Sequence, residues 1–126
     1  TNDKMIAFWD MLPTFADIID YPDPLETDGL SMLPDLLGSA GQQHQYLYWD
    51  YGHVRDTYSQ ALRYGDYKIL SIVKGDDKRY ELYDLREDIG ETRDIASKHP
   101  DVLDSMKQML NKAYSYTDNY PRVIHH

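Results

Sequence analysis

Histidines and carboxylates are the residues of this 126-residue chain that are able to do acid–base or metal chemistry. The chain contains no cysteine, which excludes disulfides, thiolate metal sites and cysteine nucleophiles. It also lacks a glycine-rich phosphate-binding loop and a Gly-x-Ser-x-Gly elbow. No pair of histidines has the His-x-x-x-His spacing of a helical zinc site, and the five are His44, His53, His99, His125 and His126. The spacing of these residues therefore predicts no familiar catalytic centre.

Two short polar pairs resemble the oxygen donors of metal sites, namely Asp76-Asp77 and Asp118-Asn119. The first pair is predicted at the tip of a hairpin, where aspartate is common because it stabilises turns. The second pair lies in a C-terminal tail without supporting ligands. The terminal pair His125-His126 is a weak ligand set on its own. We therefore predict no metal site in this chain.

The most promising binding residues lie in segment 51–56, which is predicted to be a loop after an aromatic strand. His53 in this segment is preceded by Gly52 and followed closely by Arg55, next to charges of both signs. A histidine and a guanidinium at the end of a strand can bind an anionic group. The alternative is a surface histidine that is hydrogen-bonded to the neighbouring loop. His53 and Arg55 are the candidate substrate-binding residues of the sequence.

The composition indicates one globular domain, with 41% hydrophobic and 28% charged residues. The net charge is −9, which argues against nucleic acid or an anionic membrane surface as a partner. No apolar run approaches the roughly 18 residues that a membrane span requires. The charge is unevenly placed, because residues 1–44 hold eight acidic residues and a single basic one. Twelve tyrosines are typical of half-buried strands and also of sugar-binding surfaces.

The first segment of the chain is predicted to form a helix over about Asp10–Asp20. Pro13 fits only in a first helical turn, which sets the start of the regular helix. Apolar residues at i, i+4, i+7 and i+11 form one helical face, and they are Phe8, Leu12, Phe15 and Ile19. Met11 and Ile18 lie off that face, so the helix is apolar around much of its circumference. It is either a central core helix of this domain or a helix whose natural partner surface lies elsewhere.

The remaining pattern indicates a connector, four strands and a final helix. Residues 21–41 are rich in turn-forming residues, with a short helical turn at Leu33–Leu37. Turns at Gly65-Asp66 and at Gly75–Lys78 separate segments of strand composition. The predicted strands, which would pair as an antiparallel meander, are Tyr46–Tyr51, Ser59–Tyr64, Tyr67–Val73 and Arg79–Leu85.

The final helix is predicted to begin at Pro100 and to carry one apolar stripe, in which Met106 and Met109 are core residues. Such a one-sided helix is expected to cross one face of the sheet. The predicted fold class is therefore α+β: a small antiparallel sheet of about four strands packed against a C-terminal helix, preceded by an N-terminal helix and a loop-rich segment. We divide the chain into a helix and connector at 1–44, a sheet and helix at 45–114, and a tail at 115–126.

Several short sequence blocks occur in a characteristic order along the chain. These blocks are Ala7–Asp17, Asp28–Pro34 with Leu36-Leu37-Gly38, Tyr46–Asp50, Gln60–Arg63 with Gly65–Lys68, Glu81–Leu85, Asp88–Thr92 and His99-Pro100. Each block is weak alone, but together they span about residues 7–110. The chain resembles the C-terminal part of an arylsulfatase-type enzyme.

This resemblance implies that the chain is one part of a sulfuric ester hydrolase. Sulfatases use a formylglycine made within a Cys/Ser-x-Pro-x-Arg motif, together with calcium, and this chain contains no such motif. The resemblance therefore implies an N-terminal catalytic domain of the same parent chain, against which residues 1–44 pack. It implies no cofactor and no catalytic residue in this fragment, which is expected to be inactive alone and able to self-associate.

The resemblance also implies that the His53 loop, with Arg55, borders the substrate cleft and contacts a sulfated carbohydrate or aryl sulfate. It implies a periplasmic or secreted parent. The alternative from another class is a free-standing module that uses its tyrosines and the His53 loop to bind a carbohydrate or an anion.

Overall fold

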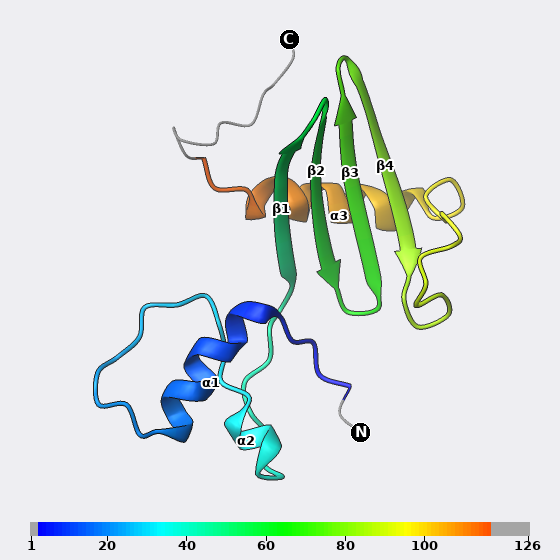
Figure 1. Ribbon diagram of the computed structural model, residues 1–126. Helices are drawn as coiled ribbons and strands as arrows, with labels where there is room; N and C mark the ends of the chain where they lie inside the picture. The colour runs from blue at the N-terminus through cyan, green and yellow to red at the C-terminus, as the bar shows by residue number, and fades with distance from the viewer. Residues whose placement is uncertain (1–2, 117–126) are drawn as a thin grey trace. The chain divides into compact units, whose positions relative to one another are not determined.

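The computed structural model of the protein describes residues 3–116, and Figure 1 shows its elements. In chain order they are η1 (Phe8–Asp10), α1 (Met11–Ile18), α2 (Leu33–Leu36), β1 (Leu47–Val54), β2 (Thr57–Tyr64), β3 (Tyr67–Lys74), β4 (Asp77–Asp84) and α3 (Pro100–Ala113). The chain forms two compact units, Thr1–Gln45 and Tyr46–His126. The predicted features Asp118-Asn119 and His125-His126 lie outside the described residues.

The second unit contains a four-stranded antiparallel sheet with the strand order β1-β2-β3-β4. Consecutive strands are joined by two-residue turns, so the meander predicted from the sequence is confirmed. Glycine is the first residue of two of these turns, and φ is +57° at Gly65 and +58° at Gly75. Glycine adopts such angles without steric cost, and its use here matches the right-handed twist of the flanking strands.

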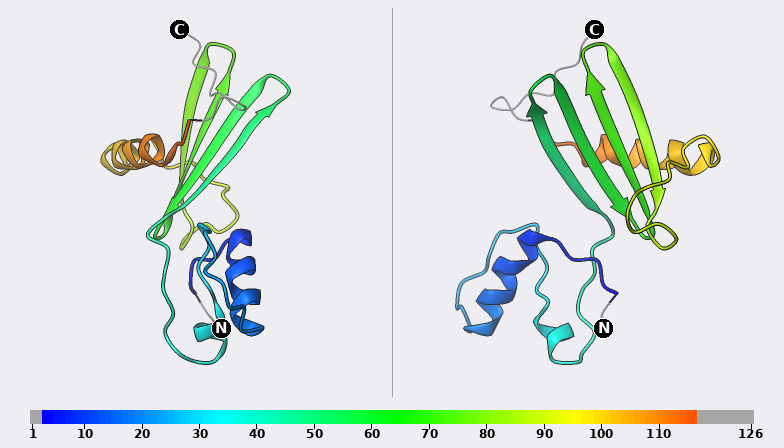
Figure 2. Two further views of the ribbon diagram at one scale, coloured as in Figure 1. Left: turned by 90° about the vertical axis from the view of Figure 1, so that its left-hand side faces the viewer. Right: turned by 45° about the vertical axis from the view of Figure 1, so that its right-hand side comes forward.

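The core of this unit lies between α3 and one face of the sheet (Figure 2). Leu62, Ile69 and Leu82 are direct neighbours across β2, β3 and β4 and are fully buried. Met106 and Leu110 of α3 pack on them, and Met109 adds partly buried surface, which confirms the predicted core role of both methionines. Burying each of these large side chains contributes roughly 1.5–3 kcal/mol, so this contact holds the helix on the sheet. The α+β fold class is thereby confirmed.

The first unit is organised around a buried carboxylate, that of Asp10, which is 1% exposed. Its oxygens accept hydrogen bonds from the backbone N–H of Ala7 and of Leu30, both at 2.8 Å. The ring of His44 lies 2.7 Å from Oδ1. Burial alone would raise the pKa of Asp10, but these donors outweigh it and hold the pKa below the ordinary value. One side chain thus joins the start of α1 to segments 20 and 34 residues away.

Thr14 strengthens the same connection one turn further along α1. Its hydroxyl donates to the backbone carbonyl of Asp10 at 2.6 Å and accepts from the N–H of Met32 at 2.9 Å. The backbone of Gly29 also packs closely against the Trp9 carbonyl, so that a Cβ atom at position 29 would clash with it. The buried side of α1 is therefore polar, and it is fixed by specific hydrogen bonds.

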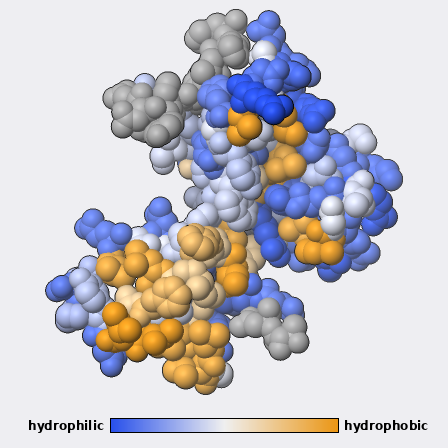
Figure 3. Space-filling view, in the orientation of Figure 1, coloured by the Kyte–Doolittle hydropathy of each residue, from blue (hydrophilic) through white to orange (hydrophobic). Residues whose placement is uncertain are grey.

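The apolar face predicted for this helix lies on its exposed side. Phe8, Leu12, Phe15 and Ile19 are each more than half exposed, and Figure 3 shows apolar residues gathered on this part of the molecule. Of the two sequence-based alternatives, the central core helix is wrong, because polar contacts occupy the side of α1 that is buried. The helix is also shorter than the predicted Asp10–Asp20. It is preceded by the 3₁₀ turn η1 and ends before Asp20, whose φ is +49°.

Candidate functional site

The candidate residues His53 and Arg55 lie at the β1–β2 hairpin, but not in the six-residue loop predicted from the sequence. Strand β1 continues through His53 to Val54, and only Arg55 and Asp56 form the turn. The loop prediction for 51–56 was wrong because Gly52 resembles a strand break in the sequence. In the structure this glycine is part of a β-bulge, which lets the strand continue.

The bulge decides which face of the sheet His53 occupies. The pairing register shifts between Asp50 and Gly52, and φ of Gly52 is +62°. His53 is consequently paired with Tyr58, two residues from the partner of Asp50. Side chains alternate along a strand, so the extra residue places His53 on the same face as Asp50 and Tyr58. The rings of His53 and Tyr58 are in contact, with centroids 4.9 Å apart.

Asp50 is the centre of a hydrogen-bond cluster beside this ring pair. Its Oδ1 accepts from the N–H of Gly52 at 2.9 Å, across the bulge. Its Oδ2 accepts from the hydroxyls of Tyr58 at 2.6 Å and Tyr48 at 3.1 Å. The amide of Gln60, 1% exposed, donates to the Tyr48 hydroxyl at 2.6 Å and lies 3.4 Å from Oδ2. Asp50 thereby fixes both the bulge and the tyrosine on which His53 packs.

Burial and the neighbouring carboxylate both disfavour ionisation of Tyr58. Desolvation raises the pKa of its hydroxyl, and the hydrogen bond to Asp50 raises it further. The hydroxyl therefore keeps its proton at any physiological pH and acts as a donor. It positions the hairpin and is not available as a base.

Arg55 has a strained backbone, with φ of +60°. It holds the first position of its two-residue turn, which Gly65 and Gly75 hold in the two other hairpins of the sheet. A left-handed conformation costs a non-glycine residue on the order of 1–2 kcal/mol. Strain that glycine would remove is often found where a side chain has a functional role. Two glycine turns in the same sheet show that this architecture accepts glycine readily.

The hairpin end presents cationic and aromatic groups with unused hydrogen-bonding capacity. Among the described residues, the Arg55 guanidinium and the His53 imidazole form no hydrogen bond or ion pair, and both residues are exposed. Asp56 in the same turn is paired with Lys74 at 3.4 Å. Guanidinium and imidazole groups donate to sulfate, carboxylate and hydroxyl oxygens. The arrangement suits recognition of an anionic or hydroxylated ligand and contains no activated nucleophile.

Asp50, Tyr58 and Gln60 were not predicted from the sequence as members of this site. Alternation along β1 and β2 was available as a signal, since it places Tyr58 and Gln60 on one face. The bulge was the obstacle, because it changes the face of every residue after it.

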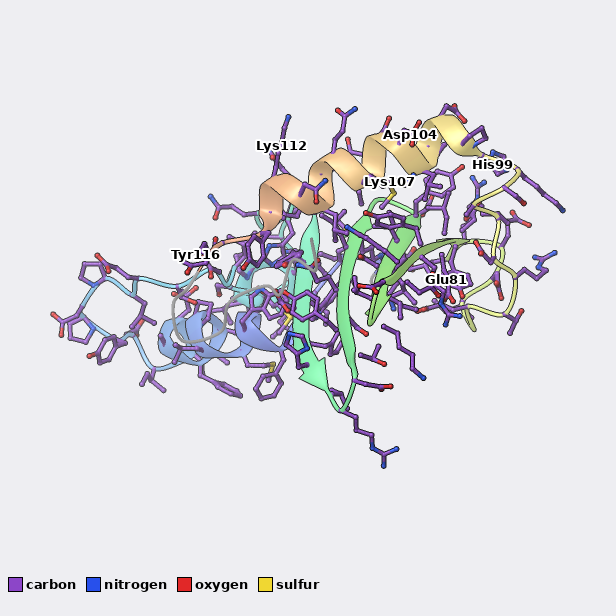
Figure 4. The ribbon with its side chains drawn as sticks, turned by 90° about the horizontal axis from the view of Figure 1, so that it is seen from above. Glu81, His99, Asp104, Lys107, Lys112 and Tyr116 are labelled. Atoms are coloured by element: carbon purple, nitrogen blue, oxygen red, sulfur yellow. The ribbon has the colours of Figure 1, made fainter. Side chains whose placement is uncertain are left out.

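A cavity of about 440 Å³ lies elsewhere in this unit, at the end of β4 and along the connector to α3. His99, at the beginning of α3 in Figure 4, contributes to its lining. Its acidic residues have structural partners: Asp88 accepts from the backbone of Thr92 and Arg93, and Asp94 accepts from Leu82 and Ala96. These carboxylates shape the connector.

Among residues 3–116, no group of three or more histidine, aspartate or glutamate side chains is arranged to hold a metal ion. Within the same residues, no helix is long and apolar enough to cross a membrane. Asp76 lies in the β3–β4 turn, as predicted, whereas Asp77 is already the first residue of β4.

The fold is that of an α+β domain, a four-stranded antiparallel sheet with a helix packed on one face. Residues 1–116 match the family model described as N-sulphoglucosamine sulphohydrolase, C-terminal. The chain belongs to this family and is a C-terminal sulfatase domain.

Known relatives agree with this assignment. Arylsulfatase K of Rattus norvegicus is 27% identical over 128 residues, covering 95% of this chain and 22% of that protein. The Delta 4,5-hexuronate-2-O-sulfatase of Bacteroides thetaiotaomicron is 30% identical over 109 residues, covering 81% of this chain and 22% of that protein. A solved 2-O GAG (glycosaminoglycan) sulfatase is similar with a TM-score of 0.69 and 28% identity, over 82% of this chain and 23% of that one. The chain spans about a fifth of the length of these relatives.

Proposed function

We propose that this domain works within a longer polypeptide that hydrolyses sulfate esters, and that its β1–β2 hairpin contacts the organic part of the substrate. The observation that carries the proposal is the family match over residues 1–116 combined with coverage of only 22% of the relatives. The match favours this function over a free-standing binding module.

The catalytic groups would come from the remainder of that polypeptide. Sulfate-ester cleavage needs an activated nucleophile and cations that stabilise the transferring group. The sequence contains no Cys/Ser-x-Pro-x-Arg motif from which a formylglycine could be made. Residues 3–116 also offer no set of acidic ligands that fits calcium. We expect the chain alone to be inactive, because formylglycine and calcium do not fit the residues it provides.

The substrate class we propose is a sulfated carbohydrate. Two similar proteins are described as acting on such compounds, a hexuronate 2-O-sulfatase and a 2-O glycosaminoglycan sulfatase. A sugar of this class carries hydroxyl, carboxylate and sulfate oxygens, which suit the exposed donors of His53 and Arg55. The aromatic rings of His53 and Tyr58 add an apolar surface beside them.

The reading frame that contains this chain provides the first test. We expect an upstream Cys/Ser-x-Pro-x-Arg motif in it, and a frame without one would reject the proposed function. The second test measures hydrolysis of sulfated disaccharides by the full-length protein. His53→Ala is expected to raise KM by about 10-fold or more with little change in kcat, since it removes a hydrogen bond to a charged group. The matched control is His99→Ala, and an equal effect of both substitutions would contradict the role of the hairpin.

A further inference from the structure

The face of the sheet that carries α3 ends in a cross-strand row of four residues, which we name the Lys78 strip. The pairing register joins His53 to Tyr58, Tyr58 to Val73, and Val73 to Lys78. Residues that are paired directly across strands point to the same face of a sheet. Tyr58 and Leu62 alternate onto the same face of β2, so the strip lies on the core side, next to α3. It begins at His53 of the hairpin site and ends on β4.

Two lysines from different elements meet at the β4 end of this strip. The ammonium groups of Lys78 and Lys107 lie 5.1 Å and 4.9 Å from the centre of the Tyr80 ring, and Figure 4 shows Lys107 on the side of α3 that faces the sheet. Among residues 3–116, Lys78 has no carboxylate partner. Lys107 is paired with Asp104 at 3.2 Å, but an exposed pair within one helix contributes less than about 1 kcal/mol. Both ammonium groups can therefore donate to an anionic ligand.

The charge distribution of the chain is compatible with an anion at this position. Residues 1–44 hold eight of the 22 acidic residues and one of the 13 basic residues, so the remaining chain holds fourteen acidic and twelve basic residues. Neighbouring strands lie about 4.8 Å apart, which places the two ends of the strip roughly 14 Å apart across four strands. Cationic or histidine side chains occupy both ends, since Arg55 lies near His53 and Lys107 lies near Lys78.

From these observations we propose that the Lys78 strip binds a sulfated oligosaccharide along its length, with Lys78 and Lys107 holding a carboxylate or sulfate group of a second sugar. This inference rests on the proposed function, in which His53 and Arg55 contact the first sugar. The separation of the two ends exceeds the length of a single sugar ring, so the second anionic group belongs to another sugar of the chain. Val73 and Tyr80 are half-buried and supply apolar surface for the sugar rings between the two ends. The strip therefore makes the domain selective for chain length.

Two substrates of different length test the proposal in the full-length protein that contains this domain. One is a sulfated disaccharide, and the other is an octasaccharide of the same repeating unit with the same terminal sulfate. The variants are Lys78→Ala and Lys107→Ala, and Lys112→Ala is the matched control because Lys112 is exposed further along the same helix. Each substitution is expected to raise KM for the octasaccharide about 10-fold with kcat unchanged, since it removes a hydrogen bond to a charged group. KM for the disaccharide, and both KM values of the control, are expected to stay unchanged.

An octasaccharide KM that Lys78→Ala leaves unchanged would overturn the second binding position while leaving the proposed function intact. An equal rise for both substrates would also overturn it, because the substitution would then act on the hairpin and not on a distant sugar. An equal effect of Lys112→Ala would reduce the effect to general charge and overturn it as well. Hydrolysis of neither substrate would reject the proposed function. In that case calorimetric titration of the octasaccharide decides the question, and equal affinity for the natural protein and Lys78→Ala would overturn the strip.

Discussion

Replacing Arg55 by glycine is predicted to stabilise the sheet unit and, at the same time, to weaken substrate recognition. The φ of Arg55 is +60°, close to the +57° and +58° of Gly65 and Gly75 at equivalent turn positions. Glycine removes a left-handed strain of about 1–2 kcal/mol from the folded state. It also increases the conformational entropy of the unfolded chain, which lowers the gain in stability by about 0.5–1 kcal/mol. The expected net gain is about 0.5–1 kcal/mol, or roughly 3–6 °C in Tm for a unit of this size.

The stability arm of this prediction uses urea unfolding followed by tryptophan fluorescence. Each unit contains one of the two tryptophans, so a Trp9→Phe background leaves Trp49 of β1 as the reporter of the sheet. Gly75→Ala is the reciprocal control, because it introduces the same strain that Arg55→Gly removes. It is expected to destabilise the unit by about 1 kcal/mol.

The recognition arm uses the full-length protein that contains this domain, with a sulfated disaccharide as the proposed substrate. Loss of a guanidinium hydrogen bond to an anionic group is worth about 1.5–3 kcal/mol, which corresponds to an increase of about 10- to 100-fold in KM. A gain in unfolding stability together with a rise in KM would show that Arg55 is kept for binding and not for the stability of the turn. A loss of stability in Arg55→Gly, or an unchanged KM, would refute the reasoning that strain is kept here for binding.

Three further changes probe the contacts that position the site and the first unit. Asp50→Asn is expected to cost about 1–2 kcal/mol and to weaken the NMR contact between the His53 and Tyr58 rings, because the amide cannot accept all the donors of the carboxylate. Gly29→Ala is expected to cost more than about 2 kcal/mol in urea unfolding, since its Cβ would lie 2.9 Å from the Trp9 carbonyl carbon, whereas Gly90→Ala meets only an ordinary contact of 3.5 Å. The pKa of Asp10 is depressed in the folded state, so its contribution is present above the ordinary value of 3.8 and is lost as pH falls below it. The stability difference between the natural chain and Asp10→Asn, measured by urea unfolding, should therefore shrink between pH 6 and pH 3, and a constant difference would contradict this.

Local periodicity was sufficient to predict the sheet and α3. Leu62, Ile69 and Leu82 each occupy an alternating strand position, and Met106 and Leu110 are spaced by one helical turn. Such patterns depend only on the spacing of neighbouring residues, so they can be recognised without knowledge of the rest of the fold. His53 was placed near the correct end of β1 for the same reason, although the bulge at Gly52 was read as the end of the strand.

The polar centre of the first unit could not be predicted in this way. Asp10 is buried because an N–H 20 residues away and a ring 34 residues away meet at its carboxylate. Contacts between residues so far apart in the sequence leave no local pattern. An aspartate before a helix is ordinarily interpreted as a solvated N-cap. The Asp50 cluster was missed for a related reason, since its tyrosine donors are recognisable only after the pairing register of β1 and β2 is known.

The arrangement of α1 is the reverse of a helix in an isolated domain, and this reversal has an energetic consequence. Asp10 and Thr14 are 1–2% exposed, whereas Phe8 and Ile19 are more than two-thirds exposed. Full burial of a large apolar side chain contributes roughly 1.5–3 kcal/mol, so the exposure of these side chains leaves on the order of 5 kcal/mol of stabilisation unrealised. The residues concerned are Phe8, Leu12, Phe15, Ile18 and Ile19. That amount is comparable to the whole stability of a small domain. A first unit held mainly by the Asp10 and Thr14 hydrogen bonds should therefore be the less stable of the two units in the isolated chain. Its amides are expected to exchange faster than those of β2 and β3 in hydrogen–deuterium exchange of the isolated chain, and equal protection of the two units would contradict this.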